Sequence, residues 1–222
     1  MPRKAVVLLS GGLDSTTALY WAKKAGFSVQ ALTLLYGQRH GRELKSARAV
    51  AVKARVSLQE VRLDLPWLRV SSLVNGSKPL PDVPMSKIGR GIPSTYVPGR
   101  NTIFLALAAS LADAAGASAI VIGANHLDYS GYPDCRPEYL KAFEKAAQKG
   151  TRRGTLGKPL RIMAPLLSLD KKQIVQLALK LKVPLELTWS CYRGGSTPCG
   201  RCDSCKLRAK GFDEAGINDP AN

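Results

Sequence analysis

A glycine-rich turn follows an apolar run close to the amino terminus and constrains the fold more than any other feature. The run is AVVLL over residues 5–9, and Ser10-Gly11-Gly12-Leu13-Asp14-Ser15-Thr16 comes directly after it. Such a run is typical of a buried strand. Glycine allows a positive φ and a close approach of the backbone to a ligand. The sequence therefore predicts a strand, a tight turn and the start of a helix.

The predicted helix start would bind an anion with its own backbone. The first amide groups of a helix have no intrahelical acceptor and lie at the positive end of the helix dipole. Phosphate oxygens are suitable acceptors, and Ser10, Ser15 and Thr16 add hydroxyl groups. The turn is neither a Walker loop nor a dinucleotide-binding turn, because it lacks Gly-Lys-Ser/Thr and Gly-x-Gly-x-x-Gly. A turn without a ligand remains the alternative interpretation.

The string Ser-Gly-Gly-x-Asp-Ser resembles the pyrophosphate loop (PP-loop) of the ATP pyrophosphatases. Members of that superfamily cleave ATP between the α and β phosphates and place AMP on a substrate oxygen. The resemblance implies catalytic roles for Ser10, Asp14 and Ser15, and Mg²⁺ bound with the nucleotide. It also implies that ATP contacts a continuous segment, Leu8, Leu9, Ser10, Gly11, Gly12, Leu13, Asp14, Ser15, Thr16, Thr17 and Ala18.

Length and charge limit the function classes. The 222 residues suit one large domain, alone or with a small appendage. No apolar run is long enough for a membrane helix, so we expect a cytoplasmic protein without a membrane partner. The formal net charge of +17 favours anionic ligands such as ATP, pyrophosphate, carboxylates or RNA. A basic surface without a specific partner remains open.

Helical and apolar strand patterns alternate along most of the chain. This alternation predicts an α/β fold, a doubly wound, Rossmann-like parallel sheet that binds ligands at the carboxyl ends of its strands. We expect a catalytic domain over residues 1–187 and a cysteine-bearing region over residues 188–222. The predicted strands are 5–9, 27–36, 58–63, 118–123 and 161–166, and the predicted helices are 15–25, 39–55, 101–117, 137–149 and 170–181.

Residues 75–100 escape this alternation. The segment is long, irregular and rich in proline and glycine. Loops of this length are uncommon in compact domains unless they cover or bind something, or are disordered. We expect a lid or an active-site wall.

Four cysteines lie close together in the tail with the spacing C-x7-C-x2-C-x2-C. Four thiolates so close in sequence suit a tetrahedral structural zinc ion. An iron–sulfur cluster and a pair of disulfides are the alternatives. Cys135 stands apart, and we expect a small buried apolar residue there. The predicted metal ligands are Cys191, Cys199, Cys202 and Cys205.

Taken together, these motifs resemble the 7-cyano-7-deazaguanine synthase family of queuosine biosynthesis. The most specific match is the string NHLDYSGYPDCRPE over residues 125–138, followed by the four-cysteine tail. Shorter matches are SGGLDS at residues 10–15, YGQRH at 36–40 and YVPGRN at 96–101. The resemblance covers the chain from the first predicted strand to the tail.

The resemblance implies a carbon–nitrogen ligase. This family converts 7-carboxy-7-deazaguanine, ammonia and ATP into the 7-cyano compound through an adenylated acid and an adenylated amide, with AMP and pyrophosphate released. Its members suggest a homodimer, and nucleic acid is not required. Arg100 is then a candidate to neutralise developing phosphate charge, as are Arg39 and Lys158. Candidate substrate residues are Arg39, His40, Asn101, Asp128, Asp134, Arg136 and Glu138.

Blander roles for these residues remain open. Each arginine and lysine can be a surface or structural cation, and Asp128, Asp134 and Glu138 can pair with Arg136 instead of substrate. His40 and His126 can be ordinary polar residues. Two other functions also remain. One is a PP-loop enzyme that thiolates tRNA, and the other is a zinc-stabilised module that binds nucleic acid without catalysis.

Overall fold

A parallel sheet forms the centre of the molecule. The structure is a computed structural model that describes residues 2–125 and 131–221. In this part of the chain five strands pair in the order β3-β2-β1-β4-β5, and every pair is parallel. The strands are β1 (Lys4–Leu8), β2 (Ser28–Leu35), β3 (Ser57–Arg62), β4 (Ala119–Val121) and β5 (Arg161–Met163). The predicted parallel sheet is therefore confirmed.

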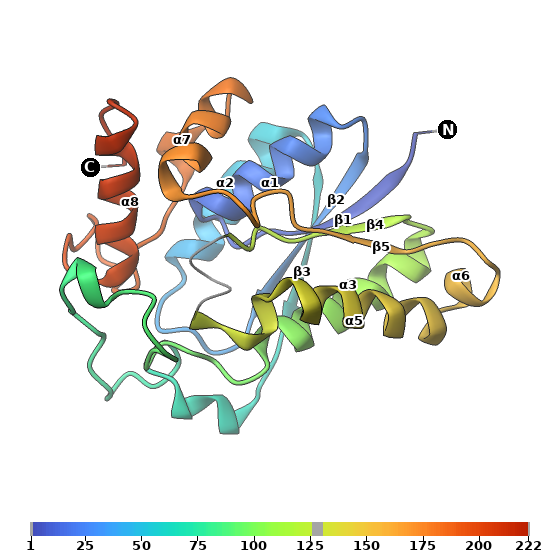
Figure 1. The fold of residues 1–222 in the computed structure, drawn as a ribbon, viewed down its shortest axis with the longest axis horizontal. Helices are drawn as coiled ribbons and strands as arrows, with labels where there is room; N and C mark the ends of the chain where they lie inside the picture. Colours follow the sequence, from blue (N-terminus) through green and yellow to red (C-terminus); the bar gives the residue numbers. More distant parts are fainter. Residues whose placement is uncertain (1, 126–130, 222) are drawn as a thin grey trace.

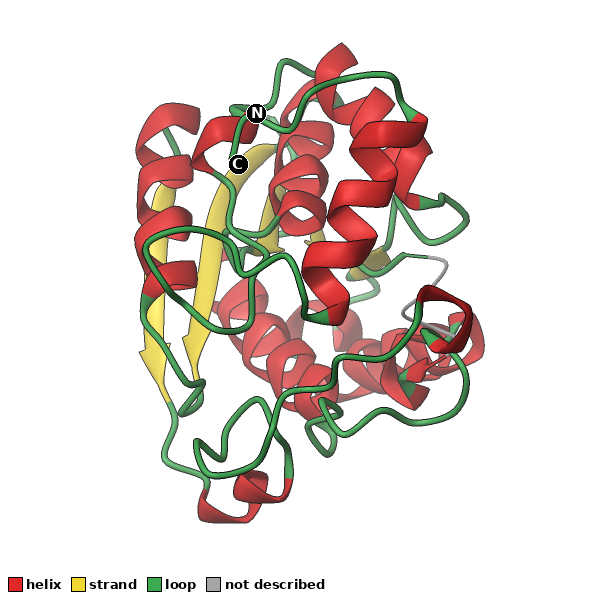
Figure 2. Ribbon diagram, turned by 90° about the vertical axis from the view of Figure 1, so that its left-hand side faces the viewer, coloured by secondary structure: helices red, strands yellow, loops and turns green. Residues whose placement is uncertain are grey.

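Helices cover both faces of the sheet, as Figures 1 and 2 show. Alternation along β1 explains this arrangement, because Val7 packs in the core beneath one layer and Val6 in the core beneath the other. The first layer holds α1 (Leu13–Lys24), α2 (Arg42–Ala54) and α7 (Lys171–Lys180), and the second holds α3 (Arg100–Ala115) and α5 (Pro137–Gly150).

Each predicted helix and strand occurs, with shifted ends. The predicted strand 118–123 is shorter in the structure because the chain turns beside α1 after Val121. A Cβ on Gly123 would lie 2.9 Å from the Ser15 nitrogen, so only glycine fits this approach. The predicted helix 39–55 begins three residues later, at Arg42, after Gly41.

The strand order places two loops side by side at the carboxyl edge of the sheet. β1 has β2 on one side and β4 on the other. The chain therefore adds strands outward from β1 in one direction first and then in the opposite direction, so the strand order reverses at β1. Ligands of doubly wound sheets bind at such a point. The loop after β1 is the Ser10 turn, and the loop after β4 contains Gly123 and Asn125.

The segment between β3 and α3 is mostly loop. It contains short 3₁₀ helices at Pro66–Val70 and Met85–Lys87. The Ser72 amide donates to the Ser94 carbonyl at 2.9 Å and closes the base of the loop. The Arg39 guanidinium donates to three carbonyls of the loop, those of Asn75, Gly76 and Lys78.

The carboxyl-terminal region packs against the first helical layer. Its helix α8 (Asp203–Glu214) crosses the start of α7 so closely that a Cβ on Gly211 would lie 2.8 Å from the Lys171 Cβ. A small helix, α6 (Arg152–Thr155), connects α5 to β5, and a 3₁₀ turn at Leu185–Leu187 follows α7. The division of the chain after residue 187 stays a prediction. In the described residues no helix has the length and apolar character that crossing a bilayer requires.

Candidate functional site

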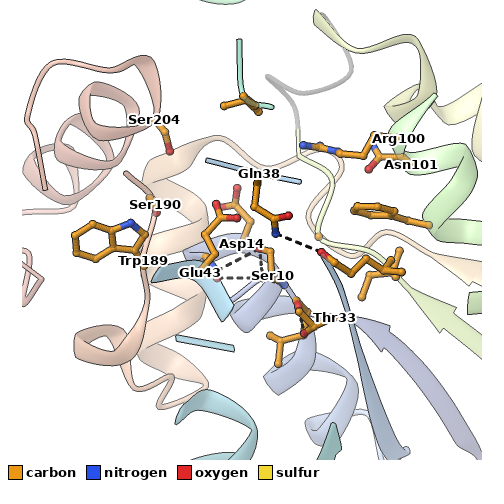
Figure 3. A pocket seen from close by; sticks show the side chains of 18 of the residues that line it. Ser10, Asp14, Thr33, Gln38, Glu43, Arg100, Asn101, Trp189, Ser190 and Ser204 are labelled. Carbon is orange, nitrogen blue, oxygen red and sulfur yellow. Dashed lines mark hydrogen bonds between the residues drawn. The ribbon is translucent and has the colours of Figure 1, made fainter. Parts of the chain in front are cut away.

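A cavity of about 260 Å³ opens at the carboxyl edge of the sheet (Figure 3). It lies at the β1 reversal point, where the strand order predicts a ligand. Its wall combines the Ser10 turn, the ends of β2 and β4, the starts of α2, α3 and α7, and part of the carboxyl-terminal region. Polar lining residues include Ser10, Asp14, Thr33, Gln38, Arg39, His40, Glu43, Arg100, Asn101, Lys171, Ser190, Ser204 and Arg208.

The start of α1 presents backbone amides to this cavity, whereas the Ser10 and Gly12 amides of the turn donate to the hydroxyls of Ser15 and Ser10. The Thr16 amide makes the first intrahelical hydrogen bond, to the Gly12 carbonyl at 3.0 Å, so the amides before it have no intrahelical acceptor. No side chain of the described residues caps α1. The hydroxyls of Ser10 and Ser15 lie 3.0 Å apart and link the two ends of the turn. This arrangement is suited to binding an anion.

Neighbouring segments hold the turn in place. Gly11 has a φ of +86°, and a Cβ there would lie 2.5 Å from the Ala47 nitrogen of α2. On the other side, the Trp189 amide donates to the Gly11 carbonyl at 2.9 Å. The Arg42 guanidinium stacks over the Trp189 ring at 4.6 Å. The turn is thus packed between α2 and the carboxyl-terminal region.

Asp14 lies at the junction of three elements. Its Oδ2 accepts hydrogen bonds from Asn125 Nδ2, at 2.9 Å, and from Lys171 Nζ. Its other oxygen, Oδ1, is buried and has no hydrogen-bond partner among the described residues. A buried carboxylate oxygen without a donor is a suitable ligand for a hard cation such as Mg²⁺.

Arg100 and Asn101 begin α3 at the opposite wall. The Arg100 guanidinium lies 5.9 Å from the Phe104 ring centre and 6.0 Å from that of Tyr132. Asn101 is held by Asp134, whose carboxylate accepts from the Asn101 amide at 2.8 Å and from its side chain at 3.3 Å. Asp134 is therefore occupied at the start of α3 and does not line the cavity.

Glu43 faces the cavity from the first turn of α2. Burial raises the pKa of its carboxyl group to about 7, although the positive charge of Arg100 acts in the opposite direction. A carboxyl group with this pKa is partly protonated at neutral pH.

His40 lies between the cavity and the cysteine segment. A Cβ on Gly194 would lie 2.0 Å from the His40 Cγ, so the chain passes directly over the ring. Burial lowers the pKa of His40, with hydrogen bonds to the Cys191 and Tyr192 backbone acting against it. His40 thus packs against the cysteine segment while it also lines the cavity, and its contact with a substrate stays a prediction.

The remaining predicted residues lie elsewhere. Arg136 and Glu138 are exposed and are absent from the cavity wall. Lys158 is also exposed and precedes β5, at the amino end of the sheet, away from the cavity. Asp128 and His126 lie outside the described residues. No residue of the predicted lid before Arg100 lines the cavity, so the lid stays a prediction.

Sequence reasoning missed several wall residues, above all Lys171 and Glu43. Lys171 follows the helix-capping Asp170 and is one of 33 lysines and arginines, so its position carried no signal. Glu43 did carry one, because it is the only acidic residue between Asp14 and Glu60. Ser190, Ser204 and Arg208 reach the cavity only through the packing of the carboxyl-terminal region.

The four tail cysteines converge beside the cavity. Their sulfur atoms all lie within 4.8 Å of one another, and those of Cys199 and Cys205 are 4.0 Å apart. Tetrahedral zinc with Zn–S bonds of about 2.3 Å needs sulfur separations of about 3.8 Å. A hydrogen bond with Cys205 lowers the pKa of Cys202 to about 5, against the effect of burial. None of the five cysteines forms a disulfide. The cluster fits a metal ion.

The model of the family "Queuosine biosynthesis protein QueC" matches residues 4–216. Curated relatives named 7-cyano-7-deazaguanine synthase match over almost their whole length. The protein of Thermoplasma volcanium is 52% identical over 99% of this chain and 90% of its own. That of Nostoc punctiforme is 49% identical over 98% of each chain.

Two solved structures share the fold at low identity. A 4-thiouridine synthetase in complex with RNA and bound ATP superposes with a TM-score of 0.52, at 21% identity, over 96% of this chain and 50% of its own. NMN synthetase from Francisella tularensis gives 0.51, at 17% identity, over 98% and 74%. At this identity the likeness concerns the fold alone.

Proposed function

The chain belongs to the QueC family of queuosine biosynthesis proteins, and on this premise we propose that it is a 7-cyano-7-deazaguanine synthase. Its substrates are 7-carboxy-7-deazaguanine, ammonia and ATP. The single observation that carries the proposal is the uncapped start of α1 in a cavity at the sheet reversal point. The relatives at about half identity, over nearly full length, support the same activity.

The Ser10 turn binds the triphosphate of ATP. Backbone amides at the start of α1 donate hydrogen bonds to the phosphate oxygens, and the hydroxyls of Ser10 and Ser15 add further donors. Lys171 carries a positive charge at the same place and offsets the charge of the departing pyrophosphate. The residues from Leu8 to Ala18 form the nucleotide-binding segment.

Two successive adenylations account for the reaction. A carboxylate oxygen is a poor leaving group, so its attack on the α-phosphorus of ATP converts it into the good leaving group AMP and releases pyrophosphate. Ammonia then displaces AMP and gives the amide. The amide oxygen attacks a second ATP in the same way, with release of pyrophosphate and of one N–H proton, and loss of AMP together with the second N–H proton forms the nitrile. Water must be excluded because the adenylates hydrolyse readily.

Two metals complete the proposal. Asp14 Oδ1 would hold Mg²⁺ together with the phosphates, since it is buried without a protein partner among the described residues. The ion supplies charge neutralisation. Zinc would be held by the four tail cysteines and have a structural function, because a fully ligated ion keeps no open position. The tail contacts the Ser10 turn through Trp189. An ordered tail therefore helps to hold the turn in its position in the cavity wall.

Product analysis tests this function. The purified chain is incubated with 7-carboxy-7-deazaguanine, ammonium and Mg-ATP, and the products are identified by mass spectrometry. We expect the 7-cyano compound, with two AMP per nitrile and pyrophosphate. The Ser10→Ala variant should bind the metal and fold normally but lose turnover. Release of ADP, or a nitrile formed without ATP, would contradict the proposal.

The thiolation of tRNA is less well supported. The basic charge of the chain favours it, and a 4-thiouridine synthetase shares the fold at 21% identity. The relatives at about 50% identity instead carry the synthase name. Incubation with tRNA and measurement of AMP release separates the two functions.

A further inference from the structure

Arg100 and Glu43 face one cavity and form no ion pair with each other. Arg100 comes from the first residue of α3, and Glu43 comes from the first turn of α2. Figure 3 shows the two side chains on different sides of the cavity. Both residues line the wall of this cavity, so a ligand bound there can contact the two side chains at once. A ligand in that space meets a cation at one end and a carboxyl at the other.

The surroundings of Arg100 suit a flat anion. Its guanidinium makes no ion pair with a described carboxylate, and rings of Phe104 and Tyr132 lie at 5.9 Å and 6.0 Å. Tyr36, directly after β2, lines the same cavity, and its ring lies 5.4 Å from that of Phe104. A guanidinium donates two parallel hydrogen bonds in one plane. A flat aromatic ligand that accepts both hydrogen bonds would lie in the plane of the guanidinium. Its ring would then pack against the same aromatic side chains.

Glu43 supplies the opposite chemistry. Its carboxyl lines the cavity, and burial makes its charged form costly. A ligand with adjacent N–H donors would remove that cost, because a carboxylate accepts two hydrogen bonds side by side.

We propose, on the premise of the proposed function, that Arg100 and Glu43 recognise opposite edges of the heterocyclic acid. Arg100 donates to the 7-carboxylate and to the neighbouring ring carbonyl oxygen. Glu43 accepts from the ring N–H and the exocyclic amino group at the other end. The cavity is thereby specific for an aminopyrimidinone that carries an acid. Arg100 then acts on this substrate, and the phosphates depend on the Ser10 turn and Lys171.

The two assignments predict separate losses of selectivity. Calorimetric titration of the full chain with its metal bound would use three ligands, which are 7-carboxy-7-deazaguanine, 7-deazaguanine without the carboxylate, and the carboxy compound without the 2-amino group. Arg100→Met should abolish the preference for the carboxylate, and Glu43→Gln should abolish the preference for the amino group. Each preference should fall by about 10- to 100-fold, as expected for a charge-assisted pair.

ATP affinity is the internal control, since neither variant should change it by more than about threefold. Arg161→Met is a matched control, because Arg161 pairs with Glu144 outside the cavity. Weaker ATP binding by Arg100→Met with the carboxylate preference intact would overturn the assignment of Arg100. An intact amino preference in Glu43→Gln would overturn that of Glu43. A wild-type chain that binds none of the three heterocycles would instead overturn the proposed function itself.

Discussion

Lys171 and Asp14 form an ion pair that joins the first residue of α7 to the first turn of α1. The two side chains are only 17% and 21% exposed, so water screens the pair weakly. Gly211 of α8 lies against Lys171, where any Cβ would come within 2.8 Å of it. The packing of the carboxyl-terminal helix therefore limits where the Lys171 ammonium can lie, and it lies beside the turn that we propose binds phosphate.

Removal of the Lys171 charge should impair catalysis more than folding. We expect Lys171→Met to lower kcat/KM for ATP by about 100-fold or more, the loss typical when one charge-stabilising group is removed. Pyrophosphate release measures this effect. Lys172→Met is the matched control, because Lys172 is exposed on the same helix turn and absent from the cavity wall. Equal activity in both variants would exclude Lys171 from the site.

Glu43 should make stability depend on pH. Its pKa is raised from 4.5 to about 7 in the folded chain, so the folded state holds the proton more tightly than the unfolded state. The contribution of Glu43 to the free energy of unfolding is therefore fully present below about pH 4.5 and is lost as the pH rises to 7. Above pH 7 the free energy of unfolding no longer changes through this group. The total loss is about 3 kcal/mol at most, at 1.36 kcal/mol per pKa unit.

Denaturant unfolding of wild type and Glu43→Gln checks this sign. Glutamine cannot ionise, so its stability relative to wild type should increase between pH 5 and pH 7.5. Comparison at each pH cancels the titration of other groups, including the thiols. A difference that stays flat, or that decreases with rising pH, would show that Glu43 ionises normally.

The backbone of the site could be predicted from the sequence because local patterns determine it. The apolar run 5–9 and the glycines after it specify a strand, a turn and a helix, and alternation of the later elements specifies a parallel sheet. The carboxyl edge then follows from topology. The four cysteines were equally clear, since all of them lie within 15 residues of one another.

Side-chain functions were harder to predict because they depend on distant packing. Asp134 lies in the family motif, yet its contacts go to the start of α3. Arg39 lies beside the cavity but donates to loop carbonyls 36 to 39 residues away. Lys171 reaches Asp14 across 157 residues. No local sequence pattern indicates contacts between residues that are so far apart in the chain.

Loss of the metal should loosen the cavity as well as the tail. Trp189 donates its ring N–H to the Cys191 carbonyl at 2.8 Å and its amide to the Gly11 carbonyl at 2.9 Å. We expect Cys199→Ser or strong chelation to lower Tm by at least about 5 °C, which corresponds to roughly 2 kcal/mol in a chain of this size. Trp189 fluorescence should change together with ATP affinity.

Metal analysis accompanies this prediction. We expect one zinc per chain in the wild type and in Cys135→Ser, because Cys135 lies outside the cluster, and none in Cys199→Ser. Iron with the absorption of a cluster would contradict the zinc assignment. Full metal content in Cys199→Ser would exclude that cysteine as a ligand.

Breaking the buried pair of Arg208 and Asp219 should strongly destabilise the carboxyl-terminal region. They are 6% and 5% exposed and meet through two hydrogen bonds, of 2.6 Å and 2.9 Å. The guanidinium also donates to the Thr188 hydroxyl at 2.8 Å. Asp219→Ala leaves that charge buried without its carboxylate, so we expect a loss of about 3–5 kcal/mol in the free energy of unfolding.

The same helix provides a matched control in Lys210 and Glu214. That pair is 3.6 Å apart and 55% and 43% exposed, so Glu214→Ala should cost less than about 0.5 kcal/mol. Urea unfolding of the two variants measures both values. A cost below about 1 kcal/mol for Asp219→Ala would mean that water or another group replaces the carboxylate. Because Arg208 also lines the cavity, the destabilised variant should bind ATP more weakly, whereas Glu214→Ala should not.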